Sequence, residues 1–223
     1  MSSSETKKPY EWKRPKIDWK AHIERVMKSR GGKAFDPSKI YMADGGEGSL
    51  DDLENFSHPT FVMCPKDSPL GAMIIGSMFA NNTGHTKLKV VHNPGVGTTI
   101  DAIADVEVTV KGKRQIPFAF GACQKAAAGA IDYCCSVGIL PKDPIVCARL
   151  VIGIEIYVDE KANDLERVQD NMLVALVQAI VNAMCGGTTH EEAMAGSKAA
   201  HVFVNKPLLE APDLKALGLE TQA

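Results

Sequence analysis

One histidine stands out among the residues that could do acid–base chemistry. His58 is followed by Pro59, and a proline restricts the residue before it to an extended backbone. Both come directly before a short apolar run, so we expect His58 in a loop where a strand begins and where side chains can face a cleft. Because imidazole titrates near neutral pH, His58 could donate or accept a proton. Position alone favours the plainer alternative, a surface histidine without a chemical role.

A second candidate lies in a helix that is unusually rich in small residues. The run from Ile116 to Pro141 places glycines and alanines on both sides of Gln124. Small side chains let another backbone or a flat ligand come close. Gly138 and Pro141 are expected to end this helix. The pattern therefore predicts a surface that something approaches, with Gln124 as its polar group.

Other kinds of site have weaker support. His85 and His92 are seven residues apart, so a strand would direct them to opposite faces. The sequence contains neither C-x-x-C nor H-E-x-x-H, and we expect no metal. The segment 93–99 resembles a phosphate loop without its lysine and is interpreted mainly as a turn. The six cysteines lie scattered in apolar segments, which is typical of free buried thiols in a reducing cytosol.

Composition disfavours several classes of partner. The chain has 223 residues and a net charge of −2, which fits one domain with an appendage and gives no reason to expect nucleic acid. No apolar run reaches the roughly 18 residues of a membrane span. The first 20 residues are polar and lysine-rich, without the apolar core of a signal peptide. We therefore expect a cytoplasmic protein that contacts no membrane.

The elements that must position these residues fall into three parts. Residues 1–57 are interpreted as an N-terminal extension with a short helix, residues 58–205 as the main domain, and residues 206–223 as a tail. The order of elements predicts an α+β fold with helices packed on one sheet. Strands are expected at 60–64, 85–92, 105–110 and 149–158. Helices are expected at 19–30, 69–80, 116–138 and 163–184, with a capping box at Thr189 and Glu192 starting a last short one.

Several short motifs share one register with a known family. Phe120-Gly121 and Gln124 correspond to its F-G-x-x-Q-H-G-x-A segment. The other matching residues are Pro65, Ser68-Pro69, Asn81, Gly84, Thr86, Pro94, Val108-Thr109-Val110, Gly138-Ile139-Leu140-Pro141 and Val151-x-Gly153. From His58 to about Val181 the chain resembles the formaldehyde-activating enzymes, the 5,6,7,8-tetrahydromethanopterin hydro-lyases. The resemblance is that of a divergent member with an N-terminal extension.

The resemblance implies an activity in one-carbon metabolism, methylotrophy and formaldehyde detoxification. Such enzymes condense formaldehyde with tetrahydromethanopterin, a co-substrate, to give methylene-tetrahydromethanopterin and water. The pterin amine forms a carbinolamine whose hydroxyl leaves poorly unless a general acid protonates it. The family assigns this acid to a histidine, and His58 stands at the matching position. General-acid help of this kind contributes about 10²–10⁴-fold.

The same resemblance implies substrate-binding residues. Asn81, Thr86 and Gln124 would hydrogen-bond the pterin or the aldehyde, and Lys125 and His85 would face the anionic tail of the pterin. It also implies a fold like that of ribosomal protein S5 domain 2, with helices on one face of the sheet. The family forms a homopentamer with the pterin site between neighbouring subunits, so a homo-oligomer is expected.

This chain departs from the family pattern at several positions. Thr60 replaces an aspartate, Glu107 a lysine, and Lys125 the histidine of F-G-x-x-Q-H. The lysine and histidine of N-N-K-H-G-F-T are absent, although His85 stands two positions later. An alternative is therefore a non-catalytic paralogue that binds a reduced pterin or an aldehyde as sensor or carrier. A third possibility is a structural or assembly protein whose small-residue helix is an interface.

Overall fold

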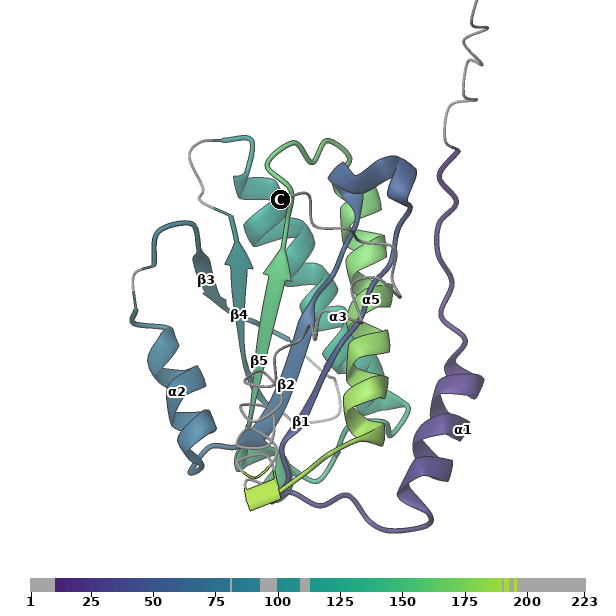
Figure 1. The fold of residues 1–223 in the computed structure, drawn as a ribbon, viewed down its shortest axis with the longest axis vertical. Helices are drawn as coiled ribbons and strands as arrows, with labels where there is room; N and C mark the ends of the chain where they lie inside the picture. Colours follow the sequence, from purple (N-terminus) through teal and green to yellow (C-terminus); the bar gives the residue numbers. More distant parts are fainter. Residues whose placement is uncertain are drawn as a thin grey trace, which may run out of the picture. The chain divides into compact units, whose positions relative to one another are not determined.

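A five-stranded sheet organises the protein in the computed structural model, which describes residues 11–80, 82–92, 100–108, 113–189, 191–192 and 195 (Figure 1). The strand order is β1-β2-β5-β4-β3. The strands are β1 (Tyr41–Asp44), β2 (Thr60–Pro65), β3 (Thr86–Lys89), β4 (Asp101–Glu107) and β5 (Leu150–Tyr157). The sheet belongs to a unit that ends at Gly187, and residues from Thr188 onward form a second unit.

The central strand β5 is the most apolar of the sheet. Its first five residues are buried, and exposure begins at Glu155. It pairs in parallel with β4 and antiparallel with β2, as expected for a strand covered on both faces. The predicted strands at 60–64, 85–92 and 149–158 are confirmed within a few residues. β4 begins four residues before the predicted 105, because Asp101–Ala104 lacks the polar–apolar alternation on which that prediction depended.

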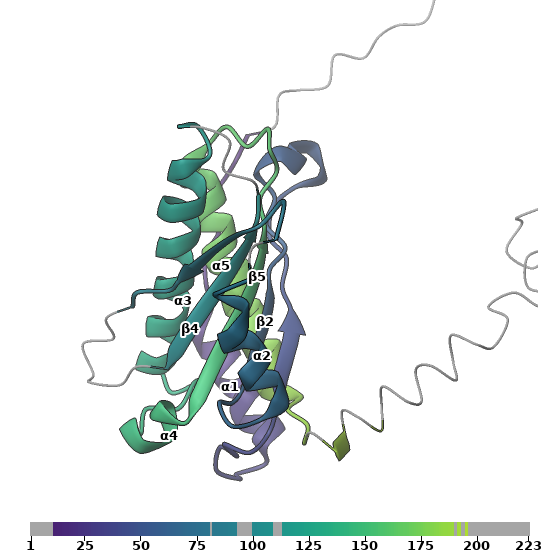
Figure 2. The ribbon, with the colours of Figure 1, turned by 90° about the vertical axis from the view of Figure 1, so that its left-hand side faces the viewer.

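Two long helices cover one face of the sheet. α5 (Leu165–Cys185) and α3 (Gln124–Ser136) contact each other and pack side by side on the sheet (Figure 2). α3 continues from a π-helical segment, η2 (Pro117–Cys123). Alternate β4 and β5 side chains enter the core beneath them. The small residues of α3 face this core: Ala126, Ala127 and Ala130 are buried. Within one subunit, the small-residue surface is therefore approached by α5 and the sheet.

A shorter helix packs against the opposite face. α2 (Pro69–Ser77) begins as predicted, with Ser68 accepting a hydrogen bond from the Gly71 backbone N–H at 3.0 Å. Gly153 in β5 makes room for it, since a Cβ there would lie 3.3 Å from the Ile74 side chain. The α+β class is confirmed. The predicted packing on one face describes α3 and α5, whereas α2 covers part of the other face.

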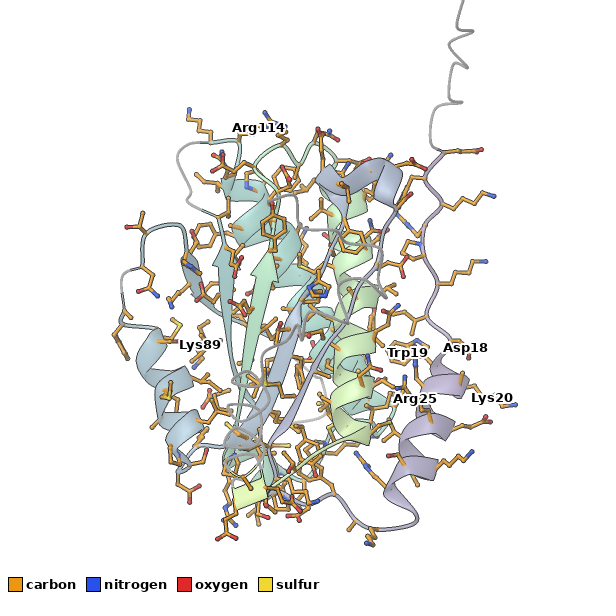
Figure 3. The ribbon with its side chains drawn as sticks, in the orientation of Figure 1. Asp18, Trp19, Lys20, Arg25, Lys89 and Arg114 are labelled. Carbon is orange, nitrogen blue, oxygen red and sulfur yellow. The ribbon has the colours of Figure 1, made fainter. Side chains whose placement is uncertain are left out.

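Residues before 58 contribute to this sheet. The predicted helix at 19–30 is confirmed as α1 (Trp19–Arg30), capped by Asp18 and ended by Gly31 at φ 58°. Trp19 packs on Tyr133 with ring centroids 5.9 Å apart, while Lys20 points away from the sheet (Figure 3). β1 and the short helix η1 (Leu50–Asn55) also come from this segment. Part of the predicted extension therefore forms an edge strand beside β2.

Four further features of the chain bear on the sequence analysis. α4 (Pro144–Ala148) is a short helix that the sequence analysis did not predict. In the second unit, Thr189 and Glu192 form the predicted capping box through reciprocal bonds of 2.6 and 3.2 Å. The predicted tail at 206–223 lies outside the described residues. α5 has the length and apolar composition of a membrane span, but 67% of that stretch is buried inside the protein.

Candidate functional site

The sheet face that carries α2 holds an open groove of about 290 Å³. Its floor and its α2 wall are apolar, and one end is polar. The apolar lining includes Val62, Leu70, Met73, Ile74, Ile103 and Gly153, and the polar end is formed by Thr60, Asp105 and Glu155. A flat apolar floor that ends in polar groups suits a ring-shaped ligand with one reactive edge.

Strand register aligns the polar end. Thr60 lies opposite Glu155, Glu155 beside Asp105, and Asp105 opposite Lys87. Lys87 donates to Asp105 at 3.0 Å, and Nδ1 of His85 lies 3.1 Å from the other oxygen of this carboxylate. One row of side chains thus runs across four strands.

His58 stands at the same end of this face. The β1–β2 ladder continues beyond the strands through a bond from the Gly45 N–H to the Pro59 carbonyl at 3.1 Å. Gly46 lies beside His58, because a Cβ on it would be 3.6 Å from the imidazole Cδ2. Since side chains alternate along an extended chain, His58 and Thr60 share a face. His58 is exposed, so its imidazole is accessible from solvent on this face.

A neighbouring hollow of about 340 Å³ is lined partly by His85, which was predicted as a site residue, and by Lys87. Asp105 links this hollow to the groove, because it contacts both of these side chains. Thr86 has a structural contact, donating to the Val108 carbonyl at 2.8 Å. Asn81, predicted to bind substrate, lies outside the described residues.

The two predicted residues on α3 are separated from this face. Gln124 donates its Nε2 to the Val91 carbonyl at 2.8 Å, and Lys125 is exposed. α3 packs on the side of the sheet opposite α2. The chain therefore brings His58 and His85 to the face that carries α2, and leaves Gln124 and Lys125 on the layer of α3 and α5.

The sequence analysis missed both ionisable residues of the groove lining, Asp105 and Glu155. Glu155 interrupts the apolar run of β5, and its pKa is raised. The causes, in order, are a hydrogen bond with Glu107, partial burial, and the charges of Glu107 and Asp105, against which His85 acts. Sequence alone identified Glu107 only as a departure from the family. A charged residue inside an otherwise apolar strand was the available signal for Glu155.

Comparison with known proteins gives this site a context. The chain matches the formaldehyde-activating enzyme (Fae) family over residues 45–204. It belongs to that family. It is 27% identical over 156 residues to the 5,6,7,8-tetrahydromethanopterin hydro-lyase of Methanosarcina barkeri, a match that covers 70% of this chain and 86% of that protein.

Longer relatives share the same region. The chain is 27% identical over 139 residues to the bifunctional enzyme Fae/Hps of Methanocella arvoryzae, and this match covers 62% of the chain but 35% of that enzyme. The bifunctional enzyme Fae/Hps of Archaeoglobus fulgidus gives the same identity and coverage. The chain thus spans about a third of these bifunctional family members. All six predicted site residues lie within the region that matches the family.

Possible metal ligands and thiols can be located in the described part of the chain. No group of three or more His, Cys, Asp or Glu side chains there could hold a metal ion. All six cysteines are free and five are buried. Burial raises the pKa of the Cys123 thiol to about 12, which keeps it protonated and unreactive.

Proposed function

We propose that the protein condenses formaldehyde with tetrahydromethanopterin to give methylene-tetrahydromethanopterin and water. The carrying observation is the family match over residues 45–204, a region that includes His58. His58 comes two residues before Thr60, which lines the polar end of the groove. In this proposal the pterin ring lies on the apolar floor and its reactive amines face His58. Formaldehyde and the pterin are the substrates, and the reaction is placed in the cytoplasm.

The proposed chemistry begins with a C–N bond between a pterin amine and formaldehyde. The amine proton passes to oxygen and produces a carbinolamine. His58 then donates a proton to the hydroxyl, the C–O bond breaks, and water leaves. The nitrogen lone pair forms an iminium, which the second pterin amine attacks. Because the acid acts on a poor leaving group, it should contribute about 10²–10⁴-fold to the rate.

We further propose a homo-oligomer, a pentamer as in the resembling family, with the site shared between neighbours. Exposed apolar side chains support an interface on this face. Met42 and Met73 line the groove and are 63% and 71% exposed, and Phe79, two residues after α2, is 87% exposed. A neighbour could bring its own Gln124 and Lys125 to the groove. The pterin site would then be complete only in the assembly.

A stopped-flow assay of formaldehyde with tetrahydromethanopterin tests the proposal. The protein should accelerate formation of the methylene product above the uncatalysed rate, with saturation in the pterin. The control is the same assay with heat-denatured protein, which removes the fold and keeps the amines of the chain. An unchanged rate with saturating protein would show that the condensation is not the activity.

A non-catalytic pterin- or aldehyde-binding protein is the second candidate. Thr60 and Glu107 favour it, since they stand where the family has an aspartate and a lysine, so that a carboxylate and a cation of the family pattern are both replaced. Calorimetry separates the two candidates. Heat of pterin binding without any acceleration supports the binding protein, whereas binding with acceleration supports the enzyme.

A further inference from the structure

We propose that Glu107 and Glu155 form a carboxyl pair that accepts the proton released when the second pterin amine closes the ring. This inference rests on the proposed function. It assigns a base to a reaction for which His58 supplies only the acid.

Strand register brings the two carboxyl groups together. Glu155 is the residue of β5 next to Asp105 of β4, and Glu107 lies two residues further along β4, beside Tyr157. Residues two apart on a strand share a face, so Glu107 points to the groove side with Glu155. A hydrogen bond with Glu107 is the first cause of the raised pKa of Glu155, which agrees with this register. A carboxylate only accepts hydrogen bonds, so the pair must hold one proton between its two groups.

The charged groups near the pair on the described strands already have partners or are negative themselves. From β3, Lys87 and His85 both contact Asp105. From β1, Asp44 accepts from the Thr60 hydroxyl at 2.7 Å. No ion pair joins either glutamate to a lysine, arginine or histidine of the described chain. His58 comes just before β2 on this face, and Tyr157 lies on β5 beside Glu107. The hydrogen bond with Glu107, partial burial and the charges of Glu107 and Asp105 raise the pKa of Glu155, which makes it a stronger base than an ordinary carboxylate.

Acid and base would then stand on either side of one carbon atom. Diagonal neighbours on adjacent antiparallel strands are about 7–8 Å apart, and His58 is diagonal to Glu155 if the β2–β5 register continues beyond Thr60. That spacing admits a one-carbon unit with the nitrogen atoms that bind it. The proton balance also closes. The first amine proton goes to formaldehyde oxygen, His58 adds another, and water leaves with both. The pair takes the proton of the second amine and returns one to His58 through solvent.

The test compares Glu155→Gln with the wild type in the condensation assay. We expect kcat to fall about 10²-fold with a small change in KM, because the base acts after binding. A base works when deprotonated, so wild-type kcat should rise with pH through the pKa of the pair, and Glu155→Gln should lose this rise. Glu155→Asp should recover part of the rate. Glu24→Gln on α1, outside the groove, is the matched control and should behave as wild type.

Glu107→Gln supplies a readout that a structural role would not produce. Without the second carboxyl, the pKa of Glu155 should fall toward the ordinary glutamate value of about 4.3, and the rise in kcat should move to lower pH. Carbon-13 NMR of the glutamate carboxyls should show the same movement without any substrate. A wild-type Glu155 that titrates in the ordinary range would overturn the shared proton.

The outcomes separate this inference from the proposed function. A wild type that accelerates the condensation while Glu155→Gln keeps its rate and pH profile overturns the role of the pair and leaves the function standing. A wild type without acceleration overturns both. Acceleration that loses its rise with pH in Glu155→Gln, and keeps it in Glu24→Gln, supports both.

Discussion

At the scale of single residues, the groove illustrates how a site can cost stability. Glu155 carries a raised pKa, chiefly through its hydrogen bond with Glu107, so the folded protein binds this proton more tightly than the unfolded chain does. Natural sequences retain such unfavourable arrangements mainly where function requires them. The interpretation of this pair as functional therefore has a consequence for stability that can be measured without substrate.

Glu155→Gln should stabilise the folded protein at neutral pH. A carboxyl with a raised pKa costs nothing below its unfolded pKa, where both states are protonated, and costs most above its folded pKa. The free energy of unfolding of the wild type should thus fall relative to Glu155→Gln as pH rises from about 4 to 7. Urea denaturation at both pH values measures this. A variant less stable than wild type at pH 7 would contradict it.

His92 offers a second test at the residue scale. Its side chain is 3% exposed, with Nδ1 3.0 Å from Asp132 on α3 and Nε2 2.8 Å from the Ile100 carbonyl. Asp132→Ala leaves one ring nitrogen without its partner and should lower the free energy of unfolding by about 1–3 kcal/mol. Urea denaturation measures the change in the free energy of unfolding, and the exposed Glu24→Ala is the control. Equal loss in both variants would show that the contact contributes nothing specific.

At the scale of elements, the sequence predicted helices better than strands. Asp18 and Ser68-Pro69 are local capping signals, and both helices begin where these residues indicate. β1 has only four residues, of which the first three are apolar, so its sequence lacks the polar–apolar alternation of a strand. Its place depends on pairing with β2, which the sequence does not show. α4 was missed although Asp143 caps it, because its five residues offer no helical period.

The contrast between local sequence signals and tertiary strand pairing also applies to the candidate site. The sequence analysis proposed His58 from the family register and His85 as a histidine two positions beyond the family's own, and the fold places both on one face. Glu155 escaped prediction because its partnership with Glu107 depends on the parallel register of β4 and β5. Such a register follows from tertiary packing, since parallel strands are joined only through distant crossovers.

Gly45 tests how tightly β1 is held. A Cβ on this residue would lie 1.9 Å from the backbone oxygen of Ala175 in α5, which cannot move without the helix. Gly45→Ala should lower the free energy of unfolding by about 1–3 kcal/mol or more. The control is Gly76→Ala in α2, where nothing lies within 4 Å and about 0.5–1 kcal/mol should be gained. Thermal unfolding measures the stability of both variants. Equal stability changes in the two would contradict the close packing of Gly45 against α5.

At the scale of the whole molecule, the proposed assembly depends on the exposed apolar side chains of α2 and β1. Their position beside the groove means that loss of the interface should also affect substrate binding. Gln124 and Lys125 lie on the layer opposite His58. A proposed pterin site that uses all three residues would therefore need a second copy of the chain.

Phe79→Asp combined with Met73→Asp should break the assembly. Both side chains are largely exposed in the single chain, so the charges should cost little folding stability but much in an apolar interface. Mass photometry should show smaller species than wild type, with reduced pterin affinity. Met27→Asp on α1, an exposed methionine outside the groove, is the matched control. An unchanged mass for the double variant would place the interface elsewhere.

The most direct test of the account is the rate of methylene-tetrahydromethanopterin formation by His58→Ala. We predict a fall in kcat of about 10²–10⁴-fold with pterin binding retained, because the general acid is lost while the groove remains. His22→Gln on α1 should keep the wild-type rate. A His58→Ala protein that is as fast as the wild type would contradict the assignment of this histidine as the acid.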